Sequence, residues 1–220
     1  MALGLSIGNG DGGEILPYIS FDAKAGRLFR VDRVQGSDGN YSTEKHEITD
    51  KAQFVADLAN IRVGWINYTS QGPVRKLVTL GKEPIPARPD GKNSEGKPAF
   101  KQGFEIDLML NKDAGGGPAR ILGSSAACVI EAMDELHDTF GNAPESKSGK
   151  LPVVKVTSVT PVKSKQSTNY KPVFSIIAWV DRPAGLQAIA DAPKPAAAPS
   201  TGSTPVAPPA PQVASASDFG

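Results

Sequence analysis

Aromatic and basic side chains alternate in three separate segments of this 220-residue sequence. An aromatic ring can stack on a nucleobase, and a neighbouring Lys or Arg can neutralise a phosphate, so single-stranded nucleic acid requires this combination. A ring taken alone is more often part of a hydrophobic core, but the recurrence in three segments favours binding. The candidate binding residues are Lys24, Arg27, Phe29, Arg30, Arg62, Trp65, Tyr68, Arg75, Lys76, Lys163, Lys165, Tyr170, Lys171 and Trp179.

Charge is unevenly distributed along the chain, although the formal net charge is only +1. Residues 146–180 contain six lysines and no acid, and residues 62–101 contain eight Lys or Arg against three acids. Residues 131–145 have five acids and neither Lys nor Arg. This asymmetry suits a polyanionic partner on one side of the molecule. Charge alone supports a solvated, solubilising surface equally well.

The residues that could do enzymatic chemistry are poorly placed for it. His46 and His137 lack Cys or acid partners at the spacing of metal ligands, so we expect no zinc site. Cys128 lies near the apolar stripe of an amphipathic segment, which favours a buried structural thiol over a nucleophile. Residues 115–120 lack the Gly-Lys-Ser/Thr ending of a phosphate-binding loop. We therefore predict a protein that is not an enzyme and needs no cofactor or metal.

The single cysteine and the hydropathy pattern indicate the compartment. One cysteine cannot form an internal disulfide, which fits a reducing environment. No apolar run is long enough to cross a membrane, and the first 14 residues lack the basic and apolar regions of a secretory signal. We expect a cytoplasmic protein with no membrane partner.

The segments that must position the candidate residues are mostly strand-like. Residues 103–110 alternate between apolar and polar side chains, which predicts an outer, solvated face for Glu105 and Asp107. The same alternation near the end of the chain places Phe174 in the core and Trp179 on the opposite face. Further strands are predicted over residues 28–34, 61–68, 153–162 and 173–180, and the last two are joined as a hairpin through residues 162–172.

One segment is helical. Apolar residues recur at three- and four-residue spacing from Ala126 to Phe140, Ser124 or Ser125 can cap the helix, and Gly141 can end it. Five or more short strands with one helix predict a mainly β chain. An OB-like β-barrel with loop insertions fits this small set of elements. The predicted loops are residues 81–101 and 141–150.

Composition divides the chain into three parts. Residues 1–13 are rich in Gly and polar groups and are expected to be a flexible lead. Residues 14–190 carry the strands, the helix and the candidate binding residues. Residues 191–220 form a Pro/Ala/Ser-rich tail that is too poor in large apolar groups to offset its ordering entropy, so it is expected to be disordered. The tail ends in an acidic-aromatic tip that contains Asp218 and Phe219.

This layout resembles that of bacterial and phage single-stranded-DNA-binding proteins, in which a terminal peptide recruits replication and repair partners. The segments 16–27 (LPYISFDAKAGR), 60–65 (NIRVGW) and 170–183 (YKPVFSIIAWVDRP) also look like a family of small phage and prophage proteins that bind single-stranded DNA. The resemblance implies coating of single-stranded DNA in the host cytoplasm during phage replication or recombination. It also implies partner binding by Asp218 and Phe219, although this tip has one acidic side chain where those families usually have several.

Two other classes of function remain open on the sequence. A virion structural or assembly protein can also combine a β-rich domain with a flexible tail, and an RNA-binding adaptor module can carry the same rings and cations. The 2′-hydroxyl group distinguishes RNA from DNA at a binding site. The sequence is also compatible with a homo-oligomer.

Overall fold

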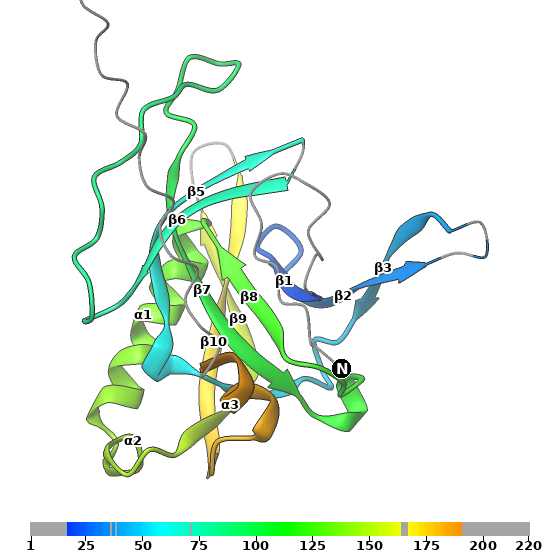
Figure 1. Cartoon of the computed structure of the whole chain (residues 1–220), viewed down its shortest axis with the longest axis vertical. Helices are drawn as coiled ribbons and strands as arrows, with labels where there is room; N and C mark the ends of the chain where they lie inside the picture. The colour runs from blue at the N-terminus through cyan, green and yellow to red at the C-terminus, as the bar shows by residue number, and fades with distance from the viewer. Residues whose placement is uncertain (1–16, 36, 38, 71, 164–166, 191–220) are drawn as a thin grey trace, which may run out of the picture.

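The part of the chain that the structure describes is mainly β, with ten strands in one mixed sheet and one long helix (Figure 1). The computed structural model describes residues 17–35, 37, 39–70, 72–163 and 167–190. The strands are β1 (Tyr18–Asp22), β2 (Arg27–Gln35), β3 (Tyr41–Glu47), β4 (Gln53–Ala56), β5 (Arg62–Thr69), β6 (Gly72–Thr79), β7 (Lys101–Leu110), β8 (Arg120–Ser124), β9 (Leu151–Lys163) and β10 (Thr168–Val180). The helices are η1 (Leu58–Asn60), η2 (Lys112–Ala114), α1 (Ala127–Asn142), α2 (Pro144–Lys147) and α3 (Ala184–Ala190).

Strand β7 is the centre of the sheet. It pairs with β8 along one edge, and with β4 and β5 along different parts of the other edge. The strand order is β10-β9-β4-β7-β8-β1-β2-β3, with β5 and β6 attached as a hairpin beside β7. The β1–β8 pair is parallel and the other pairs are antiparallel. The strand predicted over residues 103–110 is confirmed by β7, and the predicted hairpin at 162–172 by the β9–β10 pair.

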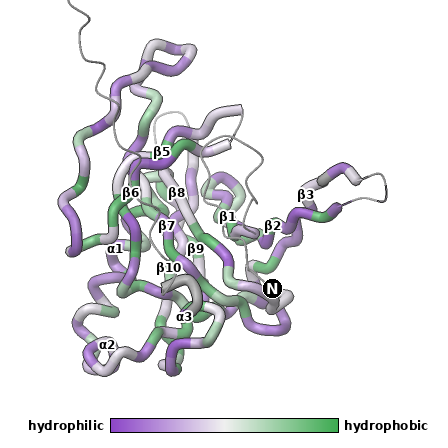
Figure 2. Tube along the Cα trace, in the orientation of Figure 1, coloured by the Kyte–Doolittle hydropathy of each residue, from purple (hydrophilic) through white to green (hydrophobic). Residues whose placement is uncertain are grey.

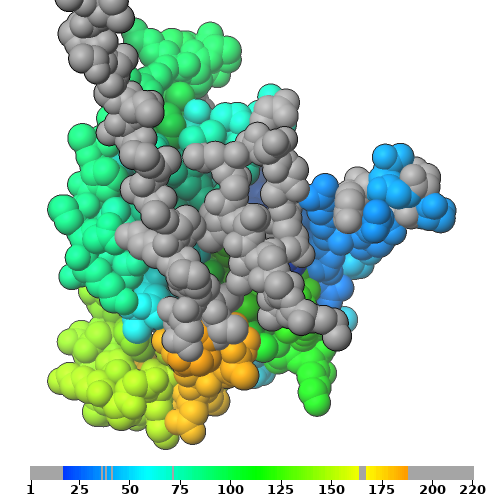
Figure 3. All heavy atoms as spheres, viewed as in Figure 1, coloured from blue at the N-terminus to red at the C-terminus, as the bar shows by residue number. Residues whose placement is uncertain are grey.

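The described strands form an open sheet, so the prediction of an OB-like barrel holds only in its coarser part, a mainly β chain with one long helix. The two ends of the strand order are β10 and β3. A backbone hydrogen bond from the Tyr170 N–H to the Ala23 carbonyl (2.6 Å) joins β10 to the β1–β2 turn, without making a ladder between strands. The β2–β3 hairpin instead extends away from the body as an arm (Figures 1 and 3).

The hydrophobic core lies between the sheet and α1. The apolar face of β7 provides Phe104, Ile106 and Leu108, which are at most 2% exposed. The helix contributes a buried stripe whose members are Cys128, Val129, Ala132, Met133, Leu136 and Phe140. Figure 2 shows hydrophobic residues gathered along the central strands. The predicted helix is therefore confirmed, but its predicted ends are wrong: the N-cap is Ala126 and not Ser124 or Ser125, and the helix continues past Gly141 to Asn142. The Ser124 hydroxyl accepts a hydrogen bond from the Ala126 N–H (3.1 Å) just before the helix begins.

The prediction that Trp179 faces away from the core is wrong. Phe174, Ile176 and Trp179 all pack against the core cluster, and the Trp179 ring stacks on Phe140 with ring centroids 5.9 Å apart. The β9–β10 register shifts twice, between Val173 and Phe174 and between Ile176 and Ala178. The first shift leaves Thr157 of β9 unpaired, and the second leaves Ile177 of β10 unpaired. The extra residue at Ile177 reverses the alternation of β10 beyond it and turns Trp179 to the same side as Phe174.

The long segment between β6 and β7 is an exposed loop, as its composition predicts. Residues 81–100 form no strand, and their isolated β-bridge joins Lys92 to Pro98 beside local backbone hydrogen bonds such as that from the Ala99 N–H to the Gly91 carbonyl (3.0 Å). Figure 1 shows this loop rising from the body beside β5 and β6. The second predicted loop, 141–150, contains the end of α1 and the short helix α2.

Candidate nucleic-acid interface

Two of the predicted binding arginines are held by buried acids of β7. Arg62 donates two hydrogen bonds to Asp107 (2.6 and 3.0 Å), and Arg75 forms an ion pair with Glu105. Glu105 and Asp107 are each 5% exposed, so the prediction that they lie on a solvated face is wrong. Burial alone would lower the pKa of Arg62, but the hydrogen bond and charge of Asp107, with Glu105 nearby, raise it overall. Both arginines therefore serve first to neutralise buried carboxylates.

The Trp65 ring is engaged by the loop between β6 and β7. Its indole N–H donates a hydrogen bond to the Pro86 carbonyl (2.8 Å), and the Arg88 guanidinium lies 4.5 Å from the ring centroid. A cation over an aromatic face is attracted to the negative charge of that face. One face of this predicted stacking platform is therefore occupied by the protein itself.

Tyr68 and Lys76 remain open to solvent on the β5–β6 hairpin. Tyr68 is 58% exposed, and Lys76 is also exposed. The pKa of Tyr68 is raised by desolvation and by the nearby charge of Glu105, with Arg75 acting in the opposite direction. The phenol is therefore neutral at physiological pH and offers a ring without a competing negative charge.

Tyr170 connects β10 to the turn between β1 and β2. An added Cβ at Gly26, which has φ +67°, would lie 3.1 Å from the Tyr170 ring, so the glycine permits both the turn and the close approach of the ring. Lys24 lies exposed on this same turn, and Lys163 is exposed at the end of β9. Lys165 lies outside the described residues.

Lys171 is neutralised by the acidic face of α1. Its ammonium lies 2.6 Å from Glu135 Oε1 and 3.1 Å from Glu131 Oε1. The hydrogen bond that Lys171 donates to Glu135, followed by the interaction with Glu131, raises the pKa of Lys171. The acidic segment that the sequence separates from the basic one is folded back onto it.

The start of the β2–β3 arm carries an ordered set of side chains. Arg27 forms an ion pair with Glu47 (2.6 Å), and the Lys45 ammonium lies 3.9 Å from the centroid of the Phe29 ring. The Phe29 ring therefore already has a cation on one face. Lys45 lies on β3 and was not among the residues that the sequence predicts.

Arg30 lies at the boundary between the arm and the loop that contains η2. Its Nη1 donates a hydrogen bond to the Ala114 carbonyl (3.1 Å), and its Nε lies 2.7 Å from the Asp32 carboxylate. Asp32 also forms an ion pair with Arg120, which is 5% exposed. Burial would raise the pKa of Asp32, but the hydrogen bond and charge of Arg120, together with Arg30, lower it overall.

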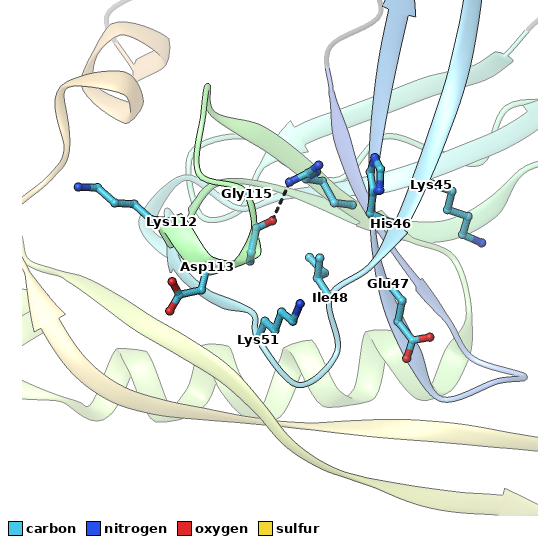
Figure 4. Close-up of a pocket in the computed structure, with 10 residues that line it drawn as sticks. Lys45, His46, Glu47, Ile48, Lys51, Lys112, Asp113 and Gly115 are labelled. Carbon is cyan, nitrogen blue, oxygen red and sulfur yellow. Dashed lines mark hydrogen bonds between the residues drawn. The ribbon is translucent and has the colours of Figure 1, made fainter.

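Sequence reasoning misses a group of cations that the fold brings beside Arg30. Lys45 comes from β3, Lys51 from the turn after it, and Lys112 from η2. With Arg30 they line one surface hollow (Figure 4). No aromatic residue lies within two positions of Lys51 or Lys112, so the pattern of alternating rings and cations does not select them.

The described residues contain no group of three or more His, Cys, Asp or Glu side chains that could hold a metal ion. Within the same part of the chain, no helix is long and apolar enough to cross a membrane. Cys128 is buried in α1, as predicted, and its sulfur lies 3.7 Å from the Tyr170 carbonyl oxygen.

No protein-family model, curated protein or solved structure matches this chain.

Proposed function

We propose that this protein binds single-stranded DNA, and that it coats and protects exposed strands during phage DNA replication or recombination. The observation that carries the proposal is the open Tyr68 ring, 58% exposed, on the same hairpin as the exposed Lys76. The register pairs Lys76 with Trp65 and so places it on the opposite face of the hairpin from Tyr68. The ring can therefore stack on a base, and the lysine can attract the phosphates of a strand that passes around the hairpin. The sequence resemblance to phage single-stranded-DNA-binding proteins supports the same conclusion.

Two further features support a surface for an extended strand. The β5–β6 and β9–β10 hairpins both extend towards the end of the molecule opposite α2 and α3 (Figure 1). Exposed lysines lie on the β1–β2 turn (Lys24) and at the end of β9 (Lys163). The hydrogen bond between Tyr170 and Ala23 brings this turn and β10 together, and it supports an OB-like interpretation of the sheet as part of the proposal.

The test is a fluorescence-anisotropy titration of the full chain with labelled dT and mixed-sequence oligomers at several salt concentrations. We expect affinity to fall with salt along a log–log slope of about −0.7 per phosphate contact, with roughly three to six contacts. Matched duplex DNA should bind more weakly. Binding that does not change with salt, or that favours duplex, would contradict the proposal.

The same titration separates the two alternative functions. Tighter binding of a ribo-oligomer of the same sequence would favour the RNA-binding adaptor, because the 2′-hydroxyl would then contribute. No binding of any oligomer would favour the virion structural or assembly protein.

We infer from the sequence that the tail binds partners through Asp218 and Phe219, which lie outside the described residues. An aromatic ring beside carboxylates can anchor in a basic-rimmed pocket of a replication or recombination protein. Pull-downs with the full chain and with Phe219→Ala should therefore return different partners. Identical partner lists would remove this role.

A further inference from the structure

A hollow of about 470 Å³ lies between the start of the β2–β3 arm, the turn after β3 and the loop around η2 (Figure 4). Its cationic lining consists of Arg30, Lys45, Lys51 and Lys112, and the backbone of Ala114 and Gly115 completes one wall. Ile48, which is 4% exposed, also lines it. None of these lysines belongs to the aromatic and basic segments that suggest nucleic-acid binding in the sequence.

The two walls of the hollow are fixed to one another by Asn111. Its side-chain amide donates a hydrogen bond to the Lys51 carbonyl (3.2 Å), and its side-chain oxygen accepts one from the Gln53 N–H (3.1 Å). The Asn111 carbonyl accepts a hydrogen bond from the Gly116 N–H (2.9 Å). One residue therefore connects the turn that carries Lys51 to the loop that carries Gly115.

Gly115 is required for the position of Arg30. It has φ +107°, and a side chain at this position would collide with the Arg30 guanidinium. Because the glycine leaves this space empty, Arg30 can reach the Ala114 carbonyl. The guanidinium is thus held in the wall of the hollow by the loop and by Asp32.

The charges that line the hollow are mostly positive and partly unused. Of the two acids in its lining, Glu47 is paired with Arg27, and Asp113 points away from the centre of the hollow in Figure 4. Among the described residues, neither Lys51 nor Lys112 has an ion pair. Figure 4 shows Lys51 pointing inward beside Ile48, with Lys45 and Lys112 extending on opposite sides.

We propose that this hollow is a phosphate subsite for the nucleic-acid backbone. One phosphodiester binds between Arg30 and Lys51, and Lys45 and Lys112 contact the phosphates on either side of it. Among the described residues, the one ring that lines the hollow is that of His46, which lies 3.3 Å from Glu44. The subsite therefore contacts the phosphates of the backbone and does not stack on the bases. This inference rests on the proposed function, and it extends the binding surface from the hairpins to the base of the arm.

The test compares two double variants of the full chain that remove the same charge. Lys51→Ala/Lys112→Ala removes two lysines of the hollow, and Lys92→Ala/Lys97→Ala removes two exposed lysines of the loop between β6 and β7. At 0.1 M salt, each lost phosphate contact should reduce affinity for a dT oligomer by roughly fivefold and flatten the salt slope by about 0.7. The hollow variant should therefore lose about 25-fold and the control should change little. Melting curves verify that both variants fold.

A second measurement separates failure of the subsite from failure of the proposed function. Pyrophosphate is titrated into ¹⁵N-labelled wild-type protein, and we expect amide shifts concentrated at residues 48–51 and 112–116. If the wild type binds dT oligomers but both double variants behave alike, the subsite is overturned and the proposed function stands. If no oligomer binds but pyrophosphate shifts these amides, the proposed function fails and a site for free phosphate remains. If neither ligand binds, both proposals are overturned.

Discussion

The arginines of the β5–β6 hairpin and the lysines of the hollow carry the same charge but have different partners. Arg62 and Arg75 lie against Glu105 and Asp107, two carboxylates that are almost fully buried. In the described structure Lys51 has no ion pair and lies in a hollow that is open to solvent. A buried carboxylate that loses its cation is strongly unfavourable, so the arginines are not available to a ligand without cost to the fold. The number of cations in a segment is therefore a poor measure of its capacity to bind a polyanion.

The aromatic rings differ in the same way. Trp179 is stacked on Phe140, and Trp65 is held by Pro86 and Arg88. Tyr68 has most of its surface exposed. A ring already packed by the protein contributes to stability, and an open ring can stack on a base. Substitution of an engaged side chain should therefore reduce stability, and substitution of an open one should reduce binding.

The largest effect is expected when a buried acid loses its arginine. Arg62→Gln leaves Asp107, which is 5% exposed, without its cation and should lower the free energy of unfolding by about 3–5 kcal/mol. Urea denaturation measures this change. Lys97→Gln, in the exposed pair with Glu95, is the matched control and should cost less than about 1 kcal/mol. Equal effects of the two substitutions would show that the buried acids do not hold the arginines.

The next effect concerns an engaged ring. Trp179→Ala removes the stack on Phe140 and should destabilise the fold by about 3 kcal/mol. This loss is at the low end for a tryptophan in a core, because the Trp179 ring is only partly buried. Affinity for single-stranded DNA, measured well below the melting temperature, should stay close to that of the wild type. A stable Trp179→Ala protein with weakened DNA binding would restore this ring as a platform.

The open ring should show the opposite behaviour. Tyr68→Ala should weaken binding of a dT oligomer by about 1–3 kcal/mol, because a stacked base would be lost. Its melting temperature should be nearly that of the wild type, since the side chain is exposed. Tyr68→Phe keeps the ring and should retain most of the affinity. If both substitutions leave affinity unchanged, Tyr68 does not stack on DNA.

The smallest effect is expected at Lys171, an engaged lysine on an otherwise basic segment. Its pairs with Glu131 and Glu135 raise its pKa, so they stabilise the fold fully below the ordinary lysine pKa of about 10.4 and are lost as pH rises through the higher folded value. Between pH 7 and 9 the stability difference between wild type and Lys171→Ala should therefore be constant. A free lysine that contacts a phosphate would contribute about 0.7 to the salt slope of DNA binding. Lys171→Ala should change this slope by much less than that. A full loss of one contact would show that DNA displaces the glutamates.

Local periodicity in the sequence determined much of the fold. The alternation in 103–110 predicts β7, the three- and four-residue spacing of apolar residues predicts α1, and the pattern around 162–172 predicts the β9–β10 hairpin. These predictions succeed because the side chains of one strand or one helix share a face through local geometry alone. The exposure of Tyr68 does not follow from periodicity, because Tyr68 is in phase with buried Ile66; it is exposed because β5 extends beyond its pairing with β7 at this point.

The tertiary structure decided which side chains are engaged. Alternation assigns Trp179 to the wrong face because the extra residue in β10, Ile177, depends on the pairing of this strand with β9. Glu105 and Asp107 are buried because β5 and β6 bring Arg62 and Arg75 to them from segments far away in the chain. The hollow combines side chains from β2, β3, the following turn and η2, and Asn111 fixes their positions through contacts with residues about 60 positions earlier in the chain. Periodicity carries no information about such contacts, because they arise from the packing of elements that are distant in sequence.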